Sequence, residues 1–468
     1  MVHEALNNVS PDLPLILILN ENEMSISRNT GAFARYIADI RASASYLATK
    51  RRTARLLHKI PMIGKPIYHM LRGITRHVKR SIYHSNYFES LGLLYLGPVN
   101  GNDYSRVERV LRQAKSRHGA VLVHIKTQKG KGYAPAEADP SGYHSTRGEG
   151  SESSTDSFHS VFGEELLSCA RENPRIAAIT AAMGLGCGIE NFRTAFPERY
   201  FDVGIAEEHA TTFAAGMAAD GMIPCFAVYS TFLQRAYDNI LHDVALQNLP
   251  VKFFIDRAGL ALHDGATHHG IFDVAYLSGI PHIRLYAPAT YGSLRAIMHH
   301  VLALPGPCAI RYPNAAEDPR VPARFYPEGR YDEFGVRPDY PSDTIPDNVI
   351  LTYGGIISRV LDAADEARTQ GKSVGVILLE ELKPYDLLAK RIKPFLRSHT
   401  HVLFVEEGIE NGGAAALTLL SLHRCMGADF PADYHILAIS DHFAAPSAPT
   451  DLYRFCKIGR EDILANLI

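Results

Sequence analysis

The sequence predicts an α/β protein with mostly parallel sheets, and two observations support this fold class. Short apolar runs typical of buried strands alternate with segments of helical periodicity along the whole chain. Several of these runs end in polar, glycine-containing clusters, and open parallel sheets bind ligands at such strand ends. The length of 468 residues exceeds what a single core usually holds, so we expect two or three domains.

The apolar runs place the strands in order. A helix over Glu4–Asn8 is expected to lead straight into a buried first strand. The predicted strands are Leu15–Leu19, Val121–Lys126, Ala177–Thr180, Ile223–Ala227, Val251–Ile255, Val349–Thr352, Ser373–Leu379 and His401–Val405. A short strand over Phe201–Ile205 precedes a helix of small residues over Thr211–Met217.

Two breaks divide the chain. Pro135–Asp156 is rich in Pro, Gly, Ser and acidic residues, which is typical of a linker. Prolines cluster and the apolar periodicity fades between Pro313 and Asp347. We therefore predict three domains, at 1–150, 151–318 and 345–468.

The segment 35–80 departs from the even charge balance, with twelve Lys and Arg residues against one acid, Asp39. A basic amphipathic stretch can lie on a membrane surface or bind nucleic acid. Pro61, Gly64 and Pro66 interrupt any long helix, however, which favours a solvated excursion over an active site.

The composition excludes several classes of protein. A net charge of −2 argues against a general nucleic-acid binder. No apolar run reaches the roughly 18 residues of a membrane span, and the N-terminus lacks the pattern of a secretory signal. The six cysteines lie far apart without a C-x-x-C pair, so neither a zinc knuckle nor a disulfide framework is indicated. We expect a cytoplasmic protein.

Ala206-Glu-Glu-His209 places Glu207 and His209 at the turn between the short strand and the helix of small residues. A glutamate there can simply complement the helix dipole. The clusters Ile255-Asp-Arg-Ala-Gly259 and Asp264-Gly-Ala-Thr-His-His-Gly270 also follow an apolar strand. One sheet edge would then collect carboxylates, imidazoles and guanidiniums, which favours a catalytic role for Glu207.

For the histidines and arginines near these clusters, alternative interpretations remain open. His268 and His269 are adjacent, so their rings point apart in an extended chain and cannot share one metal ion; either could donate a hydrogen bond to a substrate oxygen. Arg235 and Arg257 could clamp a phosphate or carboxylate, or form structural ion pairs.

Two N-terminal clusters fit phosphate and metal chemistry. Asn22 follows the first strand and offers a carboxamide oxygen, a ligand type that Mg²⁺ accepts, although an Asx turn is an equal alternative. Lys126-Thr-Gln-Lys-Gly-Lys-Gly-Tyr133 has glycines that let backbone amides approach a ligand, but it is not a Walker motif. In the last domain, we interpret three segments as tight turns that allow close packing: Leu351-Thr-Tyr-Gly-Gly355, Leu382-Lys-Pro-Tyr-Asp386 and Glu406–Gly413.

These clusters, in this order, resemble the 1-deoxy-D-xylulose-5-phosphate synthases, thiamine-diphosphate enzymes of the transketolase superfamily. The most specific matches are Asn20-Glu-Asn-Glu-Met-Ser-Ile-Ser27, Gly97-Pro-Val-Asn-Gly101, Lys129-Gly-Lys-Gly-Tyr-Ala-Pro-Ala-Glu137, Ala206-Glu-Glu-His209, Tyr229-Ser-Thr-Phe-Leu-Gln-Arg235 and Asp256-Arg-Ala-Gly259. The resemblance implies a three-domain transketolase-like architecture, a homodimer, and a transferase that condenses pyruvate with glyceraldehyde 3-phosphate for isoprenoid, thiamine and pyridoxal synthesis.

The resemblance also implies roles for individual residues. Asn22 and the carbonyl of Met24 would bind Mg²⁺, and Lys129 and Tyr133 would approach the cofactor. Glu207 would hydrogen-bond the aminopyrimidine of thiamine diphosphate and promote its imino form. Phe232 would pack against the pyrimidine. The substrate pocket would be lined by Tyr229, Arg235, Arg257, Asp264 and His268, of which Asp264 and His268 are candidate catalytic residues.

Three departures from the family pattern affect these expectations. The run Arg311-Tyr-Pro-Asn314 has an asparagine where the family has a phosphate-binding arginine, a loss of roughly 1.5 to 3 kcal/mol that predicts weaker acceptor binding. The motif Ala206-Glu-Glu-His209 has a second carboxylate, Glu208, which we expect to point away from the site. The third departure is the lack of a Gly-Asp-Gly motif, whose aspartate binds Mg²⁺ in the family.

The missing motif leaves three hypotheses. The first is a synthase whose first domain is incomplete. The second is a non-catalytic or accessory subunit, completed by a separate N-terminal polypeptide. The third is a thiamine enzyme with other substrates, such as a split transketolase or a 2-oxo acid dehydrogenase subunit. An incomplete first domain would expose an apolar sheet edge at Leu15–Leu19.

Overall fold

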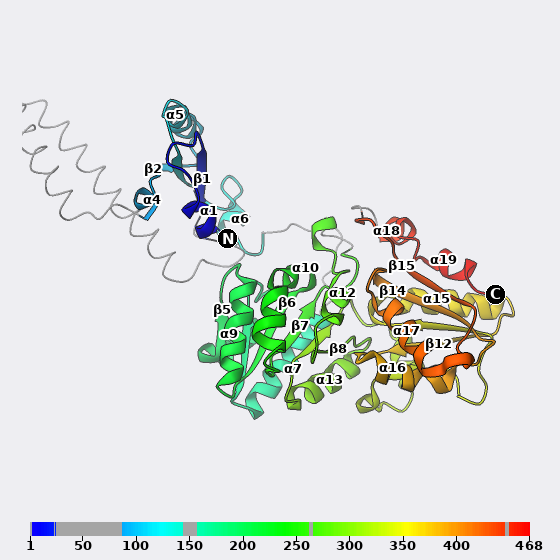
Figure 1. Cartoon of the computed structure of the whole chain (residues 1–468). Coiled ribbons are helices and arrows are strands. Elements are labelled where there is room, and N and C mark those ends of the chain that lie inside the picture. Colours follow the sequence, from blue (N-terminus) through cyan, green and yellow to red (C-terminus); the bar gives the residue numbers. More distant parts are fainter. Residues whose placement is uncertain (1, 23, 25–86, 144–156, 262–264, 445–448) are drawn as a thin grey trace, which may run out of the picture. The chain divides into compact units, whose positions relative to one another are not determined.

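The computed structural model describes residues 2–22, 24, 87–143, 157–261, 265–444 and 449–468. The chain divides into two compact units, Met1–Ser151 and Glu152–Ile468, called unit 1 and unit 2 below. Unit 1 has helices packed on one parallel sheet, and unit 2 has helices packed on two mostly parallel sheets (Figure 1), so the predicted α/β class is confirmed. The basic segment 35–80 lies outside the described residues. The three domain ranges stay predictions.

Unit 1 contains a parallel sheet of three strands in the order β1-β3-β2. Its described elements are α1 (Val2–Asn7), β1 (Ile16–Glu21), α4 (Tyr87–Ser90), β2 (Leu94–Asn100), α5 (Tyr104–Lys115), β3 (Val121–Lys126) and α6 (Ala134–Ala138). The central strand β3 is buried because Val121 and Val123 pack in a cluster with α5, whereas Leu122 packs in a second cluster with Phe88. Because the three strands are parallel, all of them end at the same edge of the sheet.

Two expectations for unit 1 are wrong. The first strand is not buried: β1 is an edge strand of the described sheet, and Ile16 and Ile18 are 38% and 56% exposed. The exposed apolar edge expected of an incomplete domain is therefore present. The linker prediction fails where it begins, because Pro135 is the second residue of the short helix α6, where proline removes no helical hydrogen bond.

Unit 2 begins with a seven-stranded sheet in the order β13-β8-β9-β7-β6-β4-β5, parallel except for β13. Its strands are β4 (Ile176–Thr180), β5 (Tyr200–Asp202), β6 (Ile223–Tyr229), β7 (Lys252–Asp256), β8 (Arg284–Tyr286), β9 (Cys308–Arg311) and β13 (Glu381–Lys383). The helices of this part include α7 (Phe158–Glu172), α8 (Glu190–Ala195), α9 (Glu207–Ala219), α10 (Ser230–Leu233), α11 (Tyr237–Asn239), α12 (Asp273–Ser278), α13 (Tyr291–Ala303) and α14 (Arg320–Phe325).

The rest of unit 2 is a five-stranded sheet in the order β10-β12-β11-β14-β15, in which only β10 is antiparallel. Its strands are β10 (Val336–Pro338), β11 (Asn348–Thr352), β12 (Val374–Leu379), β14 (His401–Ile409) and β15 (Tyr434–Ile439). Its helices are α15 (Ile357–Thr369), α16 (Tyr385–Ile392), α17 (Ala414–Met426), α18 (Pro449–Phe455) and α19 (Arg460–Ala465).

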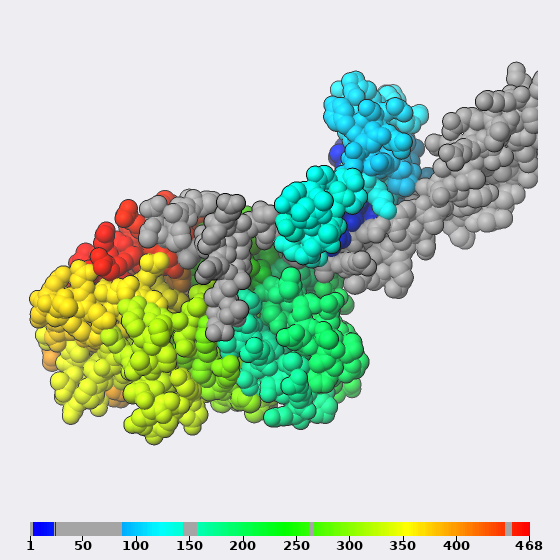
Figure 2. All heavy atoms as spheres, turned by 180° about the vertical axis from the view of Figure 1, so that it is seen from behind, coloured from blue at the N-terminus to red at the C-terminus, as the bar shows by residue number. Residues whose placement is uncertain are grey.

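The two sheets of unit 2 share a core. Strand β13 follows β12 in the chain but pairs with β8 of the larger sheet. One apolar cluster contains Val228 and Ile255 from the larger sheet together with Leu351 and Phe404 from the smaller one. Figure 2 shows the two parts of unit 2, green and yellow to red, in contact along a broad boundary. Residues of the smaller sheet can therefore reach loops of the larger one.

Candidate active site

Glu207 is the first residue of α9 and follows β5, so the predicted strand-to-helix turn is confirmed. Its side chain is almost fully buried, at 2% exposure. One guanidinium nitrogen of Arg235, Nη1, donates to both carboxylate oxygens at 3.2 Å. The start of a helix and a nearby arginine both stabilise a negative charge, so Glu207 is held as an oriented, buried carboxylate.

Arg235 links this carboxylate to aromatic rings at the end of β6 and in α10. The rings of Tyr229 and Phe232 stack with centroids 5.8 Å apart. The Arg235 guanidinium lies 5.7 Å from the Phe232 ring centre, and that of Arg257 lies 4.2 Å from the Tyr229 ring centre. The flat faces and cations predicted from the sequence are thus brought together.

The loop after β7 supplies the remaining described members of the site. Arg257 adopts a left-handed conformation with φ of 56°, directly after the strand. Gly259 and Gly270 exchange backbone hydrogen bonds of 2.8 and 2.7 Å, which close the loop. The His268 ring meets the Phe232 ring edge-on with centroids 5.5 Å apart. We refer to Glu207, Tyr229, Phe232, Arg235, Arg257 and His268 as the Glu207 cluster.

The two adjacent histidines point to different surroundings, as the sequence predicts. His268 joins the Glu207 cluster, whereas His269 is buried and its Nδ1 accepts a hydrogen bond of 2.9 Å from the Ala261 amide. Burial lowers the pKa of His269, which favours the neutral ring that this contact needs. Asp264, predicted to be a catalytic and substrate-binding residue, lies outside the described residues.

Four other residues singled out from the sequence lie outside the cluster. Glu208 is half-buried and His209 is exposed, with its ring stacked on Phe213 at 6.0 Å. Arg311 is buried and forms an ion pair, with its Nε 3.0 Å from Asp273 Oδ2. Its charge is therefore used in a structural contact. Asn314, at the position of the family's phosphate-binding arginine, is exposed.

In unit 1, the candidate metal and diphosphate residues lie just after the strands. Asn22 Oδ1 accepts a hydrogen bond of 3.0 Å from the Met24 amide, which is the Asx turn considered as an alternative from the sequence. Lys129 is half-buried, and burial lowers its pKa. Tyr133 is 58% exposed. Glu137 shapes this loop by accepting from the Gly132 amide at 2.9 Å.

Sequence reasoning missed the burial of three carboxyl groups in unit 2. Asp256 ends β7 and is fully buried, and burial raises its pKa to about 7. It belongs to a motif quoted for the resemblance, but its strand position was the only clue to burial. Glu406 and Glu407 were interpreted as part of a tight turn; they lie instead in β14 and are buried.

No helix among the described residues is long and apolar enough to cross a membrane. All six cysteines are free thiols, and five of them are buried.

Three family models match successive parts of the chain. Residues 1–127 match the family described as 1-deoxy-D-xylulose-5-phosphate synthase. Residues 156–317 match the pyrimidine binding domain of transketolase, and residues 343–463 match its C-terminal domain. The Glu207 cluster falls entirely within the second match.

Whole-chain relatives agree with these matches. The chain is 36% identical over 465 residues to the 1-deoxy-D-xylulose-5-phosphate synthase of Clostridium kluyveri, covering 97% of the chain and 72% of that protein. It is 39% identical over 451 residues to the enzyme of the same name from Pelotomaculum thermopropionicum, covering 94% and 69%. A solved structure, "Split gene transketolase, inactive beta4 tetramer", is 25% identical with a TM-score of 0.56, covering 66% of this chain and 97% of that one.

Proposed function

Because the chain belongs to the 1-deoxy-D-xylulose-5-phosphate synthase family, we propose that it condenses pyruvate with glyceraldehyde 3-phosphate, releasing CO₂ and forming 1-deoxy-D-xylulose 5-phosphate. It is a thiamine-diphosphate-dependent transferase of this type. The observation that carries the proposal is the Glu207 cluster, in which a buried carboxylate is paired with Arg235 and linked through it to two stacked rings and a second arginine.

The cluster fits the pyrimidine end of thiamine diphosphate. Glu207 is oriented by Arg235, but a carboxylate has about four lone-pair sites, so acceptor sites remain for a donor on the ring. Phe232 offers an aromatic face for stacking. The cofactor supplies the electron sink that decarboxylation of a 2-oxo acid requires. Glu207 would exchange a proton with the aminopyrimidine and so act as general acid and base.

The substrate side of the proposal uses the same cluster. Arg257 and His268 extend from one closed loop, and both contact the stacked rings, Arg257 over Tyr229 and His268 against Phe232. Arg235 is 45% exposed, so guanidinium nitrogens beyond the one on Glu207 remain accessible to an anion. We assign the acceptor aldehyde and its phosphate to these side chains and to Asp264.

In unit 1 we assign Mg²⁺ to Asn22 and the Met24 carbonyl, and the diphosphate to Lys129 and Tyr133. The carboxamide oxygen of Asn22 accepts one hydrogen bond in its turn and keeps a second lone pair for a cation. The lowered pKa of Lys129 reflects partial burial, which strengthens its attraction to an anion. Oxygen ligands with a bridging phosphate are what Mg²⁺ prefers.

Calorimetry and a turnover assay test the proposal together. Thiamine diphosphate titrated into the full chain with Mg²⁺ should bind saturably, and this binding should disappear when EDTA removes the metal ion. CO₂ should then be released from pyruvate in the presence of glyceraldehyde 3-phosphate. Absence of binding at millimolar cofactor would overturn catalysis by the chain alone.

Three wider properties belong to the same proposal. The product would feed isoprenoid, thiamine and pyridoxal synthesis, the enzyme would be a homodimer, and it would act in the cytoplasm. The free thiols support the last point, since a reducing compartment keeps cysteines unpaired. Light scattering of the purified chain would test the dimer.

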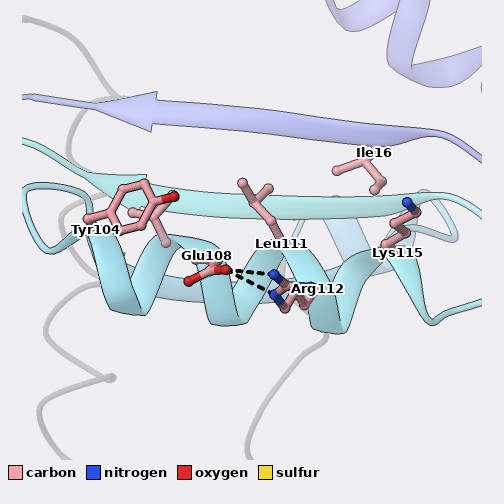
Figure 3. A pocket seen from close by; sticks show the side chains of 7 residues that line it. Ile16, Tyr104, Glu108, Leu111, Arg112 and Lys115 are labelled. Atoms are coloured by element: carbon pink, nitrogen blue, oxygen red, sulfur yellow. Dashed lines mark hydrogen bonds and ion pairs between the residues drawn. The ribbon is translucent and has the colours of Figure 1, made fainter.

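A second candidate function is an accessory subunit that a separate N-terminal polypeptide completes. The edge of β1 favours it, because exposed Ile16 and Ile18 sit on a strand with an open hydrogen-bonding side among the described residues. Next to that edge, Ile16 and the apolar parts of Tyr104 and Leu111 line a groove of about 340 Å³ on α5 (Figure 3). An added strand would cover both features.

Complementation separates the two candidates. The part of the Clostridium kluyveri relative that lies outside its match to this chain can be produced as a separate polypeptide and mixed with the chain. An accessory subunit would gain cofactor binding and turnover only in the mixture, and Ile18→Lys at the sheet edge would abolish that gain. Full turnover by the chain alone would contradict the accessory role.

A further inference from the structure

The loop that carries Arg257 and His268 is fixed by one side chain of its own and by one from a distant part of the sequence. After the Gly259–Gly270 bridge, the next two amides point at side-chain acceptors. The Leu260 amide donates to Glu407 Oε1 at 3.1 Å, and the Ala261 amide donates to His269 Nδ1 at 2.9 Å. His269 belongs to the loop itself, but Glu407 comes from β14 of the smaller sheet.

Glu407 is itself rigidly held. It is 5% exposed, and the hydroxyl of Tyr453 on α18 donates to the same oxygen, Oε1, that accepts from Leu260. The guanidinium of Arg359 lies 3.6 Å from the centre of the Tyr453 ring. Because both partners use Oε1, the loop amide meets an acceptor whose position is set by the smaller sheet and its covering helices.

Gly259 shows how closely the carboxylate approaches the loop. A Cβ at this position would lie 2.6 Å from Glu407 Oε2, which is shorter than any normal contact. Gly259 also has φ of 97°, a conformation that other residues rarely adopt. The loop therefore has a glycine at the point where Glu407 lies against its backbone.

We propose that Glu407 is a positioning residue for the acceptor side of the active site: through the Leu260 amide it fixes the Arg257–Ala261 segment, and so the placement of Arg257 over Tyr229. The carboxylate touches neither substrate nor cofactor in this assignment. This inference rests on the proposed function for its kinetic consequence, but the structural link from Glu407 to the loop stands independently of it.

The neighbouring Glu406 provides a matched control. It is also fully buried in β14, but its oxygens accept from the Ala414 and Ala415 amides, at 3.0 Å each, and from the Tyr353 hydroxyl at 2.6 Å. None of these partners belongs to the Arg257–Ala261 segment. Loss of Glu406 should destabilise unit 2 about as much as loss of Glu407, without releasing the loop.

The structural half of the test is amide hydrogen exchange in the full chain without ligands. Glu407→Ala should raise the exchange rate of the Leu260 amide at least about tenfold, since the amide loses its buried acceptor. Glu407→Gln keeps an oxygen acceptor and should restore near-wild-type exchange. Glu406→Ala should leave the Leu260 rate unchanged. Unchanged exchange in Glu407→Ala would overturn the proposal, whether or not the chain is an enzyme.

The kinetic half is a KM comparison in the cofactor-loaded protein. Glu407→Ala should raise KM for glyceraldehyde 3-phosphate about tenfold or more, while KM for pyruvate and the affinity for thiamine diphosphate stay within about twofold. Glu407→Gln should rescue this defect, and Glu406→Ala should not show it. An equal loss in every parameter would reduce Glu407 to a stabilising residue. A wild-type chain without turnover would refute the proposed function, and the exchange result would still decide the link to the loop.

Discussion

The residues of unit 2 proposed to bind the pyrimidine and those of unit 1 proposed to bind the diphosphate are held in different ways. In unit 2, Glu207 is 2% exposed and is fixed by Arg235, stacked rings and a closed loop. In unit 1, Tyr133 is 58% exposed, and the loop around it is held by contacts of Glu137 at the surface. The proposed pyrimidine-binding residues are thus preorganised by packing, whereas the proposed diphosphate-binding loop is held by local contacts at the surface.

This difference predicts which substitutions should slow the chemical step and which should weaken the binding of the cofactor and its metal ion. Buried, oriented charges act at the reacting atoms and need no rearrangement when a ligand binds. Exposed loop groups are ordered at a cost when a ligand binds, so their loss should weaken binding more than turnover. The predictions below test this division, beginning with the largest effect.

The largest effect is expected for Glu207→Gln. The amide keeps the shape of the side chain but cannot accept the proton, so kcat should fall about 10²- to 10⁴-fold while the fold is preserved. The matched control is Glu208→Gln at the next, half-buried position, which should stay within about twofold. Steady-state kinetics check both variants. Equal losses in the two variants would show that the site is not built around Glu207.

In unit 1, Asn22→Ala should weaken the binding of Mg²⁺ and, with it, of thiamine diphosphate. The Mg²⁺ concentration that gives half-maximal thiamine diphosphate binding should rise about 10- to 100-fold, because a direct oxygen ligand is lost. Asn20→Ala is the control, since the Asn20 carboxamide instead accepts from the Thr127 hydroxyl at 2.8 Å. Calorimetry at several Mg²⁺ concentrations would measure the shift. A fall in kcat with unchanged metal dependence would argue that Asn22 only forms its Asx turn.

A smaller effect is expected at the acceptor side for Asn314→Arg. The exposed position leaves room for a guanidinium, and a charge-assisted pair with phosphate contributes about 1.5 to 3 kcal/mol. KM for glyceraldehyde 3-phosphate should therefore fall about tenfold or more. KM for unphosphorylated glyceraldehyde should not change, and an equal fall for both aldehydes would show that the new arginine does not bind phosphate.

The features that could be predicted from the sequence are those that leave a local pattern in it. The fold class and eight strands followed from uninterrupted apolar runs, which buried parallel strands require. Strand β2 was missed because Gly97 and Pro98 interrupt its run, and β8 because it has only three residues. The exposure of β1 could not be read from Ile16 and Ile18, since an apolar edge strand has the same composition as a buried one.

The same holds for the candidate site, where residues in local motifs were recognised and long-range contacts were not. Glu207, Phe232 and Arg235 were recognised because each lies in a local motif, and the structure brings them into contact. The contact of Glu407 with Leu260 joins residues 147 positions apart, so no local pattern could reveal it. Long-range polar contacts depend on how sheets pack, which the sequence specifies only through the whole fold.

The smallest effect concerns stability and comes from Asp256, at the end of β7. Its Oδ1 accepts from the Arg257 amide at 2.6 Å, and its Oδ2 has no hydrogen-bond partner among the described residues. Burial raises its pKa in the folded protein to about 7, so the folded state binds a proton that the unfolded chain has released. Its contribution to stability is therefore complete below pH 4 and is lost as pH rises toward 7.

Asp256→Asn tests this sign, because the amide mimics the protonated acid and does not titrate. Between pH 5 and pH 8 the wild-type free energy of unfolding should fall relative to that of the variant by about 1 to 3 kcal/mol. The difference between the two proteins isolates Asp256 from Glu380, whose pKa burial also raises to about 7. Urea unfolding at the two pH values gives the measurement. Parallel pH profiles would mean that Asp256 is charged throughout this range and that water or a cation reaches it.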